Sequence, residues 1–238
     1  MKPIFTIARR EFSAYFTSPI AYVYLITFLV IANWLFFRAF FLIGQSDMRA
    51  FFAIMPWIFL FFVPAVAMGK WAEERKQGTL EILFTLPIRD RDIVIAKFAA
   101  GLALIASALL LTVPVAVTVA LLGDMDWGPV IGGYAGLILL GGAYLAIGLV
   151  VSALTENQII AFIVGVAVCF LMLIVGTSMV VGGASNLLTQ ALQYLGLATH
   201  FESIGRGVVD SRDIIYYLSV IGFFLFLNLK VLETRARR

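Results

Sequence analysis

The chain has 238 residues, of which 62% are hydrophobic and 13% are charged, and its formal net charge is +3. Soluble domains are roughly 45–50% apolar and about 25% charged, so one soluble core of this size cannot bury so much apolar surface. The composition therefore excludes a soluble enzyme, a disordered regulator and a nucleic-acid-binding domain. The single cysteine and single histidine also exclude an internal disulfide and a His-based cluster, and we expect no metal site.

The first element in chain order is an amphipathic helix over residues 1–18. Its apolar side chains recur at helical spacing on one face, and Arg9 and Arg10 suit anionic lipid headgroups. The dipeptide Ser18-Pro19 ends the helix, because the residue before a proline is disfavoured in a helix. We therefore predict a helix that lies in the membrane interface and does not extend the first membrane span.

Long apolar stretches follow this helix. A membrane-spanning helix needs roughly 20 predominantly apolar residues, and six stretches of the chain qualify. They are residues 20–43, 51–69, 93–122, 130–152, 158–181 and 214–229. We therefore expect an all-α membrane protein with six transmembrane helices, forming a single transmembrane domain over residues 1–238.

Lys and Arg are distributed unequally between the connections. Thirteen lie in residues 1–19, in residues 70–97 or after the last span, and four lie toward the other side: Arg38, Arg49, Arg206 and Arg212. Because positive residues stay on the cytoplasmic side of a membrane, we expect both termini and the 70–97 loop to be cytoplasmic. An even number of spans agrees with this orientation.

Glycine and proline mark several spans. We expect Pro56, Pro64 and Pro114 to bend their helices, with neighbouring helices satisfying the freed carbonyls. Gly132 and Gly136 have the spacing that lets two helices approach closely. This close approach could lie within the bundle or between two subunits.

Two other classes of function are disfavoured. A stand-alone secondary transporter usually needs an ionisable relay inside the membrane, and no span carries a central Asp, Glu or Lys. The outer segment, residues 182–213, should form short helices at the bilayer surface. It contains Ser185 and His200, which could form a catalytic pair in a membrane-embedded enzyme, but no acidic partner at a suitable spacing is clear.

The polar residues concentrate in the 70–97 loop. Gly78 interrupts the helix that leaves the membrane, Thr79 can cap a second short helix over residues 80–86, and Pro87 ends it. The apolar face of this short helix would normally contact a protein partner or the membrane surface. This face comprises Leu80, Leu83 and Phe84.

The same loop carries a family resemblance. The run Glu73-Glu74-Arg75-Lys76-Gln77-Gly78-Thr79-Leu80-Glu81, followed by Leu86-Pro87-Ile88 and Lys97, resembles the signature of ABC type-2 permeases, the membrane subunits of ATP-driven exporters. Residues 201–210 resemble the outer segment that precedes the sixth span in this family. The basic N-terminal helix resembles the family's connecting helix. The closest subgroup in appearance is the short permeases of gliding motility and nitrous-oxide-reductase maturation.

The resemblance implies partners and a place in the cell. Two permeases would form a homodimer in a bacterial inner membrane, above two copies of a separate ATPase subunit. A membrane-anchored periplasmic protein would be an optional further partner. ATP and Mg would bind the ATPase, because this chain has no phosphate-binding loop. The chain itself would hold no cofactor and would not be an enzyme.

The resemblance also assigns roles to residues. The short loop helix would be the coupling helix, seated in a groove of the ATPase, and its motion would reach the second span. This coupling would involve Glu73, Glu74, Arg75, Gly78, Thr79, Leu80, Glu81, Leu83, Phe84 and Pro87. A smaller cytoplasmic contact would comprise Thr155, Glu156 and Asn157.

The expected function is to couple ATP hydrolysis by the partner to substrate translocation or mechanical work. Asn33, Phe36 and Phe37 could line the translocation path, or they could face lipid or core. The alternatives left open are a stand-alone secondary transporter and a non-transporting membrane anchor of an ATPase complex.

Overall fold

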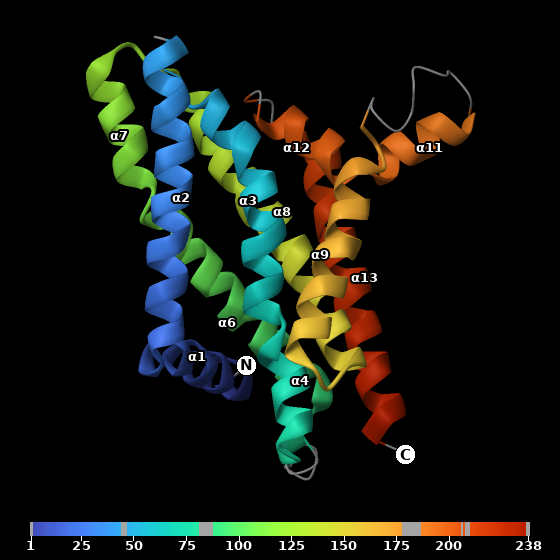
Figure 1. Ribbon diagram of the computed structural model, residues 1–238. Coiled ribbons are helices and arrows are strands. Elements are labelled where there is room, and N and C mark those ends of the chain that lie inside the picture. Colours follow the sequence, from blue (N-terminus) through green and yellow to red (C-terminus); the bar gives the residue numbers. More distant parts are fainter. Residues whose placement is uncertain are drawn as a thin grey trace.

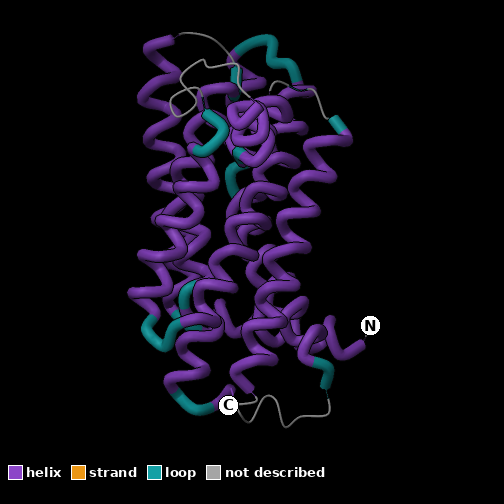
Figure 2. The backbone as a smooth tube through the Cα atoms, turned by 90° about the vertical axis from the view of Figure 1, so that its right-hand side faces the viewer, coloured by secondary structure: helices purple, strands orange, loops and turns teal. Residues whose placement is uncertain are grey.

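The computed structural model describes residues 2–43, 47–80, 88–177, 187–205, 207 and 210–236. Every regular element in these residues is a helix, and the connections lie mainly at the two ends of an elongated bundle (Figure 2). The helices are α1 (Lys2–Thr17), α2 (Pro19–Ile43), α3 (Arg49–Ala67), α4 (Gly69–Lys76), α6 (Asp90–Leu110), α7 (Val113–Leu122), α8 (Trp127–Leu154), α9 (Gln158–Ile174), α11 (Leu187–Leu195), α12 (Leu197–Gly205) and α13 (Ser211–Ala236).

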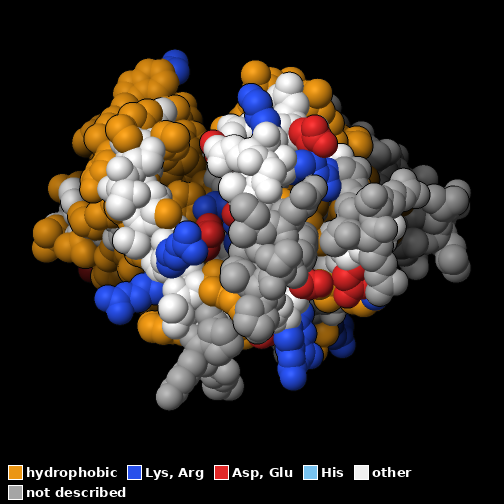
Figure 3. Space-filling model, turned by 90° about the horizontal axis from the view of Figure 1, so that it is seen from below, with side chains coloured by type: hydrophobic (Ala, Val, Ile, Leu, Met, Phe, Trp, Pro, Cys, Tyr) orange, Lys and Arg blue, Asp and Glu red, His pale blue; other side chains and the backbone are white. Residues whose placement is uncertain are grey.

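Both termini lie at one end of the bundle, which we call the basal end (Figure 1). Helices α1 and α4 lie at this end, whereas α11 and α12 lie at the opposite, distal end. Lys, Arg, Asp and Glu side chains gather on the basal face, and hydrophobic side chains flank it (Figure 3). A membrane protein needs this arrangement, with apolar side chains on the flanks that face lipid and charged side chains at the ends that face water.

Helix α1 lies across the basal end, at a steep angle to α2 (Figure 1). The break falls at Ser18, before Pro19, as the sequence predicts. Phe12 and Tyr15 pack against the core, whereas Arg9 and Arg10 are exposed. The helix is therefore amphipathic, with its apolar face turned to the bundle.

Within the residues that the structure describes, five helical segments are long and apolar enough to cross a membrane, and they correspond to all the predicted spans except the fifth. The fifth corresponds to α9, an apolar helix of 17 residues. The predicted stretch 158–181 runs past the described residues, so a sixth crossing stays a prediction. The third span is broken between α6 and α7, just before Pro114. By contrast, α3 runs through both Pro56 and Pro64.

Helix α8 forms the centre of the bundle, and its residues 140–153 are all buried. Its glycines allow this position, because a Cβ atom at Gly133 would come within 2.6 Å of the Phe52 ring. Gly136 packs against Ile204 and Phe201 of α12. Of the predicted pair Gly132 and Gly136, Gly136 therefore makes its close contact within this chain.

Candidate coupling site at the basal end

Lys97, two turns into α6, is the buried charge around which the basal end is built. Its side chain is 2% exposed. The Nζ atom forms a salt bridge with Glu74 of α4, lies 3.5 Å from Glu11 Oε1 of α1, and donates to the Lys70 carbonyl at 3.3 Å. It also lies 4.9 Å from the centre of the Trp71 ring. A buried ammonium is tolerated only when paired and hydrogen-bonded, and both conditions are met.

Glu11 extends this arrangement to a second lysine. Its Oε2 atom accepts from Lys70 Nζ at 3.1 Å, and Lys70 Nζ lies 3.8 Å from the centre of the Tyr15 ring. Burial raises the pKa of Glu11, but the charges of Lys97 and Lys70 outweigh burial and hold that pKa below its ordinary value. Two cations and two anions from three helices thus form one charge-balanced group. We call Glu11, Lys70, Glu74 and Lys97 the basal junction.

The structure brings only part of the predicted coupling set into this junction. Glu74 belongs to it directly. Glu73 is exposed and accepts from Gln77 Nε2 at 3.4 Å. Arg75 points the other way, donating from Nη1 to the Ala153 carbonyl at 3.2 Å, near the end of α8.

The end of α4 follows the sequence prediction. The helix stops at Lys76, and Gly78 adopts a φ of +69°, a conformation that favours glycine. The Thr79 hydroxyl donates back to the Glu74 carbonyl at 3.1 Å, and Leu80 packs against the core. The remaining predicted coupling residues, Glu81, Leu83, Phe84 and Pro87, lie outside the described residues.

The predicted second contact is the turn between α8 and α9. Asn157 caps α9, since its Oδ1 atom accepts from the Ile159 amide at 2.9 Å. The Thr155 hydroxyl accepts from the Asn157 amide at 3.2 Å, and Glu156 is exposed. The Arg75–Ala153 hydrogen bond places this turn beside α4. The two segments predicted to meet a partner are therefore neighbours at the basal end.

The three proposed path residues lie on α2 in different environments. Phe36 is buried in the core, with its ring centre 5.6 Å from that of Phe51. Phe37 is half-buried beside it. Asn33 is half-buried, and its Oδ1 atom has no hydrogen-bond partner.

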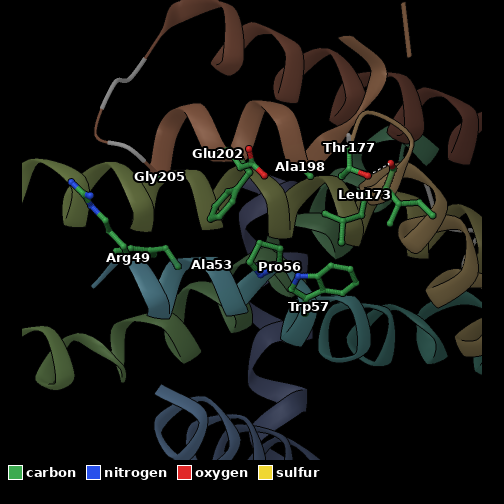
Figure 4. Close-up of a pocket in the computed structure, with 12 residues that line it drawn as sticks. Arg49, Ala53, Pro56, Trp57, Leu173, Thr177, Ala198, Glu202 and Gly205 are labelled. Atoms are coloured by element: carbon green, nitrogen blue, oxygen red, sulfur yellow. Dashed lines mark hydrogen bonds between the residues drawn. The ribbon is translucent and has the colours of Figure 1, made fainter. Parts of the chain in front are cut away.

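A cavity that sequence reasoning did not find lies near the distal end, between α3, α9 and α12 (Figure 4). Its volume is about 410 Å³. Arg49 lies at one end of it, Trp57 and Leu173 lie toward the other, and Glu202 lies between them. The remaining lining residues are mainly apolar: Phe52, Ala53, Pro56, Ile174, Ala198, Phe201 and Gly205, together with Thr177. No spacing signal could reveal this cavity, because it joins helices that are far apart in sequence.

His200 does have an acidic partner, contrary to the sequence expectation. Its Nδ1 atom lies 2.6 Å from Asp213 Oδ1, and its Nε2 atom lies 3.0 Å from the Tyr194 carbonyl. Its ring stacks on Tyr216 with the centres 3.9 Å apart. Neither ring nitrogen is free to take a proton from a substrate. Ser185, the other member of the suggested catalytic pair, lies outside the described residues.

Sequence reasoning also missed Glu11 and Lys70 as junction residues. Their partners lie 59 and 86 positions away in sequence, beyond any local spacing rule. One signal was present: Glu11 is the sole acid among the first 18 residues. A single acid in a basic amphipathic helix indicates a cationic partner outside that helix, but the sequence does not identify which one.

Comparison with known families matches residues 20–228 to the ABC-2 family transporter protein. The matched stretch includes Lys70, Glu74 and Lys97 of the basal junction and the distal cavity, whereas α1 lies before it. A comparison with curated proteins found no match. The match covers most of the sequence and agrees with the apolar helices of the structure. The chain is therefore a member of the ABC-2 transporter family, a multi-pass membrane protein of the permease type.

Proposed function

We propose that this chain is the permease subunit of an ATP-driven exporter, coupling ATP hydrolysis by a separate ATPase subunit to substrate translocation or mechanical work. The observation that carries the proposal is the basal junction. Because Lys97 is buried and bound to both Glu11 and Glu74, a force on α4 acts directly on α1 and α6.

The proposed direction of the force follows from the arrangement at the basal end. The ATPase would contact the segment that begins at Thr79, close beyond Glu74. Its movement would pull Glu74 against Lys97, and Arg75 would carry the same movement to the α8–α9 turn. The charged basal face (Figure 3) suits the cytoplasmic side of the membrane. The bundle would cross the membrane six times, and α9 would form part of the fifth crossing.

The assembly would be a homodimer with two copies of the ATPase, in a bacterial inner membrane. ATP and Mg would bind the ATPase alone. The short gliding-motility and nitrous-oxide-reductase-maturation permeases remain the proposed subgroup, with a periplasmic auxiliary protein as the optional partner. Asn33, Phe36 and Phe37 stay the proposed path residues on α2.

The distal cavity supplies a second place for substrate. Its wall is mainly apolar, with Arg49 at one end and Glu202 nearer the middle (Figure 4). Such a cavity suits an amphipathic molecule that buries an apolar part beside Trp57 and keeps a polar group near Arg49. We therefore propose amphipathic cargo.

The test is affinity purification of the tagged chain from its native membrane in mild detergent. We expect an ATPase subunit to co-elute in equal amounts, and ATP turnover to depend on the permease. Glu74→Gln should keep the ATPase bound but weaken this dependence, because it breaks the salt bridge to Lys97. Glu233→Gln is the matched control, since Glu233 pairs with the exposed Lys230 at 2.8 Å.

Elution of the wild-type chain as a lone homo-oligomer would overturn the proposal and favour a stand-alone transporter. Co-elution without any ATP-dependent movement of solute or lipid in proteoliposomes would leave the ATPase anchor as the function.

A further inference from the structure

The junction between α3 and α4 is a one-residue interruption in an otherwise continuous helical path. Helix α3 ends at Ala67, and α4 begins at Gly69. Met68, between them, keeps a helical backbone (φ −55°, ψ −39°), and its amide donates to the Pro64 carbonyl at 2.9 Å. The second span and the cytoplasmic segment are thus joined at a point where a small change would alter their relative direction.

The hydroxyl of Ser152, from α8, is inserted at this interruption. It donates to the Met68 carbonyl at 2.8 Å, and it accepts from the amides of Trp71 at 3.1 Å and Ala72 at 3.2 Å. In a regular helix the carbonyl of residue 68 accepts from the amide of residue 72. Here one fully buried side chain bonds to both groups. A side chain inserted into the backbone ladder is an established cause of a helix kink.

The face of α8 around Ser152 is shaped for this insertion. Gly148 lies one turn earlier on the same face, and a Cβ atom there would come within 2.6 Å of the Ala67 Cβ atom. Glycine therefore lets α8 approach the end of α3 closely enough for the hydroxyl to reach the interruption. Ala153, the next residue, accepts from Arg75 on the far side of the interruption. Gly148, Ser152 and Ala153 of α8 thus contact the chain on both sides of the interruption at Met68.

We infer that Ser152 is the positioning residue of a hinge between the second span and the coupling segment, and that it makes α4 and the α8–α9 turn move together. Helix α8 ends only two residues after Ser152, so the backbone at Met68 and the start of the turn are held by the same side chain. The functional part of this inference rests on the proposed role in coupling. The hinge itself rests on the hydrogen bonds alone.

The physical consequence of removing the hydroxyl is specific. In Ser152→Ala, the Met68 carbonyl and the Ala72 amide lose their bridge but can bond to one another if the helix becomes regular. We therefore expect the backbone at Met68 to become a regular helix, and the protein to stay folded. The direction of α4 changes, and the ATPase would still bind because Ser152 is buried away from any docking surface.

The test compares Ser152→Ala with a variant that makes the same chemical change elsewhere. Ser219→Ala is the control, because the exposed Ser219 hydroxyl donates to the Ile215 carbonyl of its own helix. Spin labels at the exposed positions Gln77 and Thr234 report the distance between the ends of α4 and α13 in the purified full chain. We expect this distance to shift in Ser152→Ala and to be unchanged in Ser219→Ala.

Two additional variants keep the test informative. Ser152→Cys preserves the size of the side chain but bonds weakly, so it should shift the distance even if Ser152→Ala aggregates. Ser152→Thr keeps the hydroxyl and should restore the wild-type distance. In the complex with the ATPase, Ser152→Ala should lose the permease-dependent change in ATP turnover while the amount of bound ATPase stays constant.

Unchanged distances in both Ser152→Ala and Ser152→Cys would overturn the hinge. A shifted distance with unchanged ATP turnover would overturn the role of Ser152 in coupling. If no ATPase binds the wild-type chain, the proposed function fails, while the distance measurement still decides whether the hinge exists.

Discussion

Lys97 is a buried cation whose stability depends on the charged groups around it. Its ammonium group is buried, and its two carboxylate partners are each roughly one-quarter exposed. Removing one partner of a fully buried pair costs about 3–5 kcal/mol, because the other charge is left without compensation. The partial exposure of Glu11 and Glu74 lets water compensate in part.

The first prediction is that Lys97→Met lowers the free energy of unfolding by about 2 kcal/mol, below the range for a fully buried pair. The measurement is the loss of helix in detergent as denaturant is added. Lys230→Met is the control, since the exposed Lys230–Glu233 pair should contribute at most about 0.5 kcal/mol. Equal effects of the two substitutions would contradict the central place of Lys97.

The second prediction concerns pH and Glu11. Because the pKa of Glu11 is lowered in the folded protein, its stabilising contribution is present above its ordinary pKa and is lost as the pH falls through the lowered value. The thermal midpoint should therefore fall on acidification below about pH 4.5. Glu11→Gln should lower the midpoint at pH 7 and flatten this dependence. A parallel decline in both proteins would assign the acid sensitivity to other groups.

At the scale of the elements, glycine decides how closely α8 packs. Gly148 faces the Ala67 Cβ atom, which no side-chain rotation can move away. Gly222 of α13 has nothing within 4 Å of the position that a Cβ would take. The same substitution at these two sites therefore separates packing from helix propensity.

The third prediction is that Gly148→Ala destabilises the protein by about 1–3 kcal/mol through overpacking. Gly222→Ala should be neutral or stabilising by up to about 1 kcal/mol, because alanine favours the helix. Both are measured as denaturation midpoints in the same detergent. A destabilising Gly222→Ala would indicate that α13 contacts another subunit at this position.

The fourth prediction concerns the attachment of α12 to α13. His200→Phe keeps an aromatic ring over Tyr216 but removes the hydrogen bonds to Asp213 and Tyr194. Since Asp213 is buried, we expect α12 to open locally and its amides to exchange hydrogen faster, with the basal end unchanged. Gln190→Ala, on the exposed surface of α11, is the control. Unchanged exchange in His200→Phe would show that apolar packing alone holds α12.

Several elements could be predicted from local chemistry. The break at Ser18-Pro19 and the end of α4 before Gly78 follow from proline and glycine, whose backbone preferences act within a few residues. The apolar stretches follow from length and hydrophobicity in the same way. The interruption at Met68 could not be predicted, because its cause, Ser152, lies 84 residues away in sequence.

At the scale of the whole molecule, the arrangement of charge separates the two ends. Both termini and the junction share the basal end, and the cavity and α12 lie toward the distal end (Figure 1). Sequence counting of Lys and Arg predicts which end is cytoplasmic. It could not predict which acids pair with which lysines, since charge pairs between helices depend on the packing of the complete bundle.

The fifth prediction is the orientation of the bundle. A cysteine at Gln190 should react with a membrane-impermeant maleimide added to intact cells. A cysteine at Gln77 should react only after the cells are permeabilised. The native Cys169 is buried and should stay unlabelled in both variants. The opposite labelling pattern would reverse the proposed orientation.

Burial of the basal junction also determines how the assembly can be dismantled in the laboratory. Salt screens exposed charges strongly and buried pairs much less. A concentrated salt wash should therefore strip a peripheral subunit from the basal face without loosening α1, which holds Lys97 and Lys70 from inside. The permease recovered from such a wash should still be competent to rebind its partner.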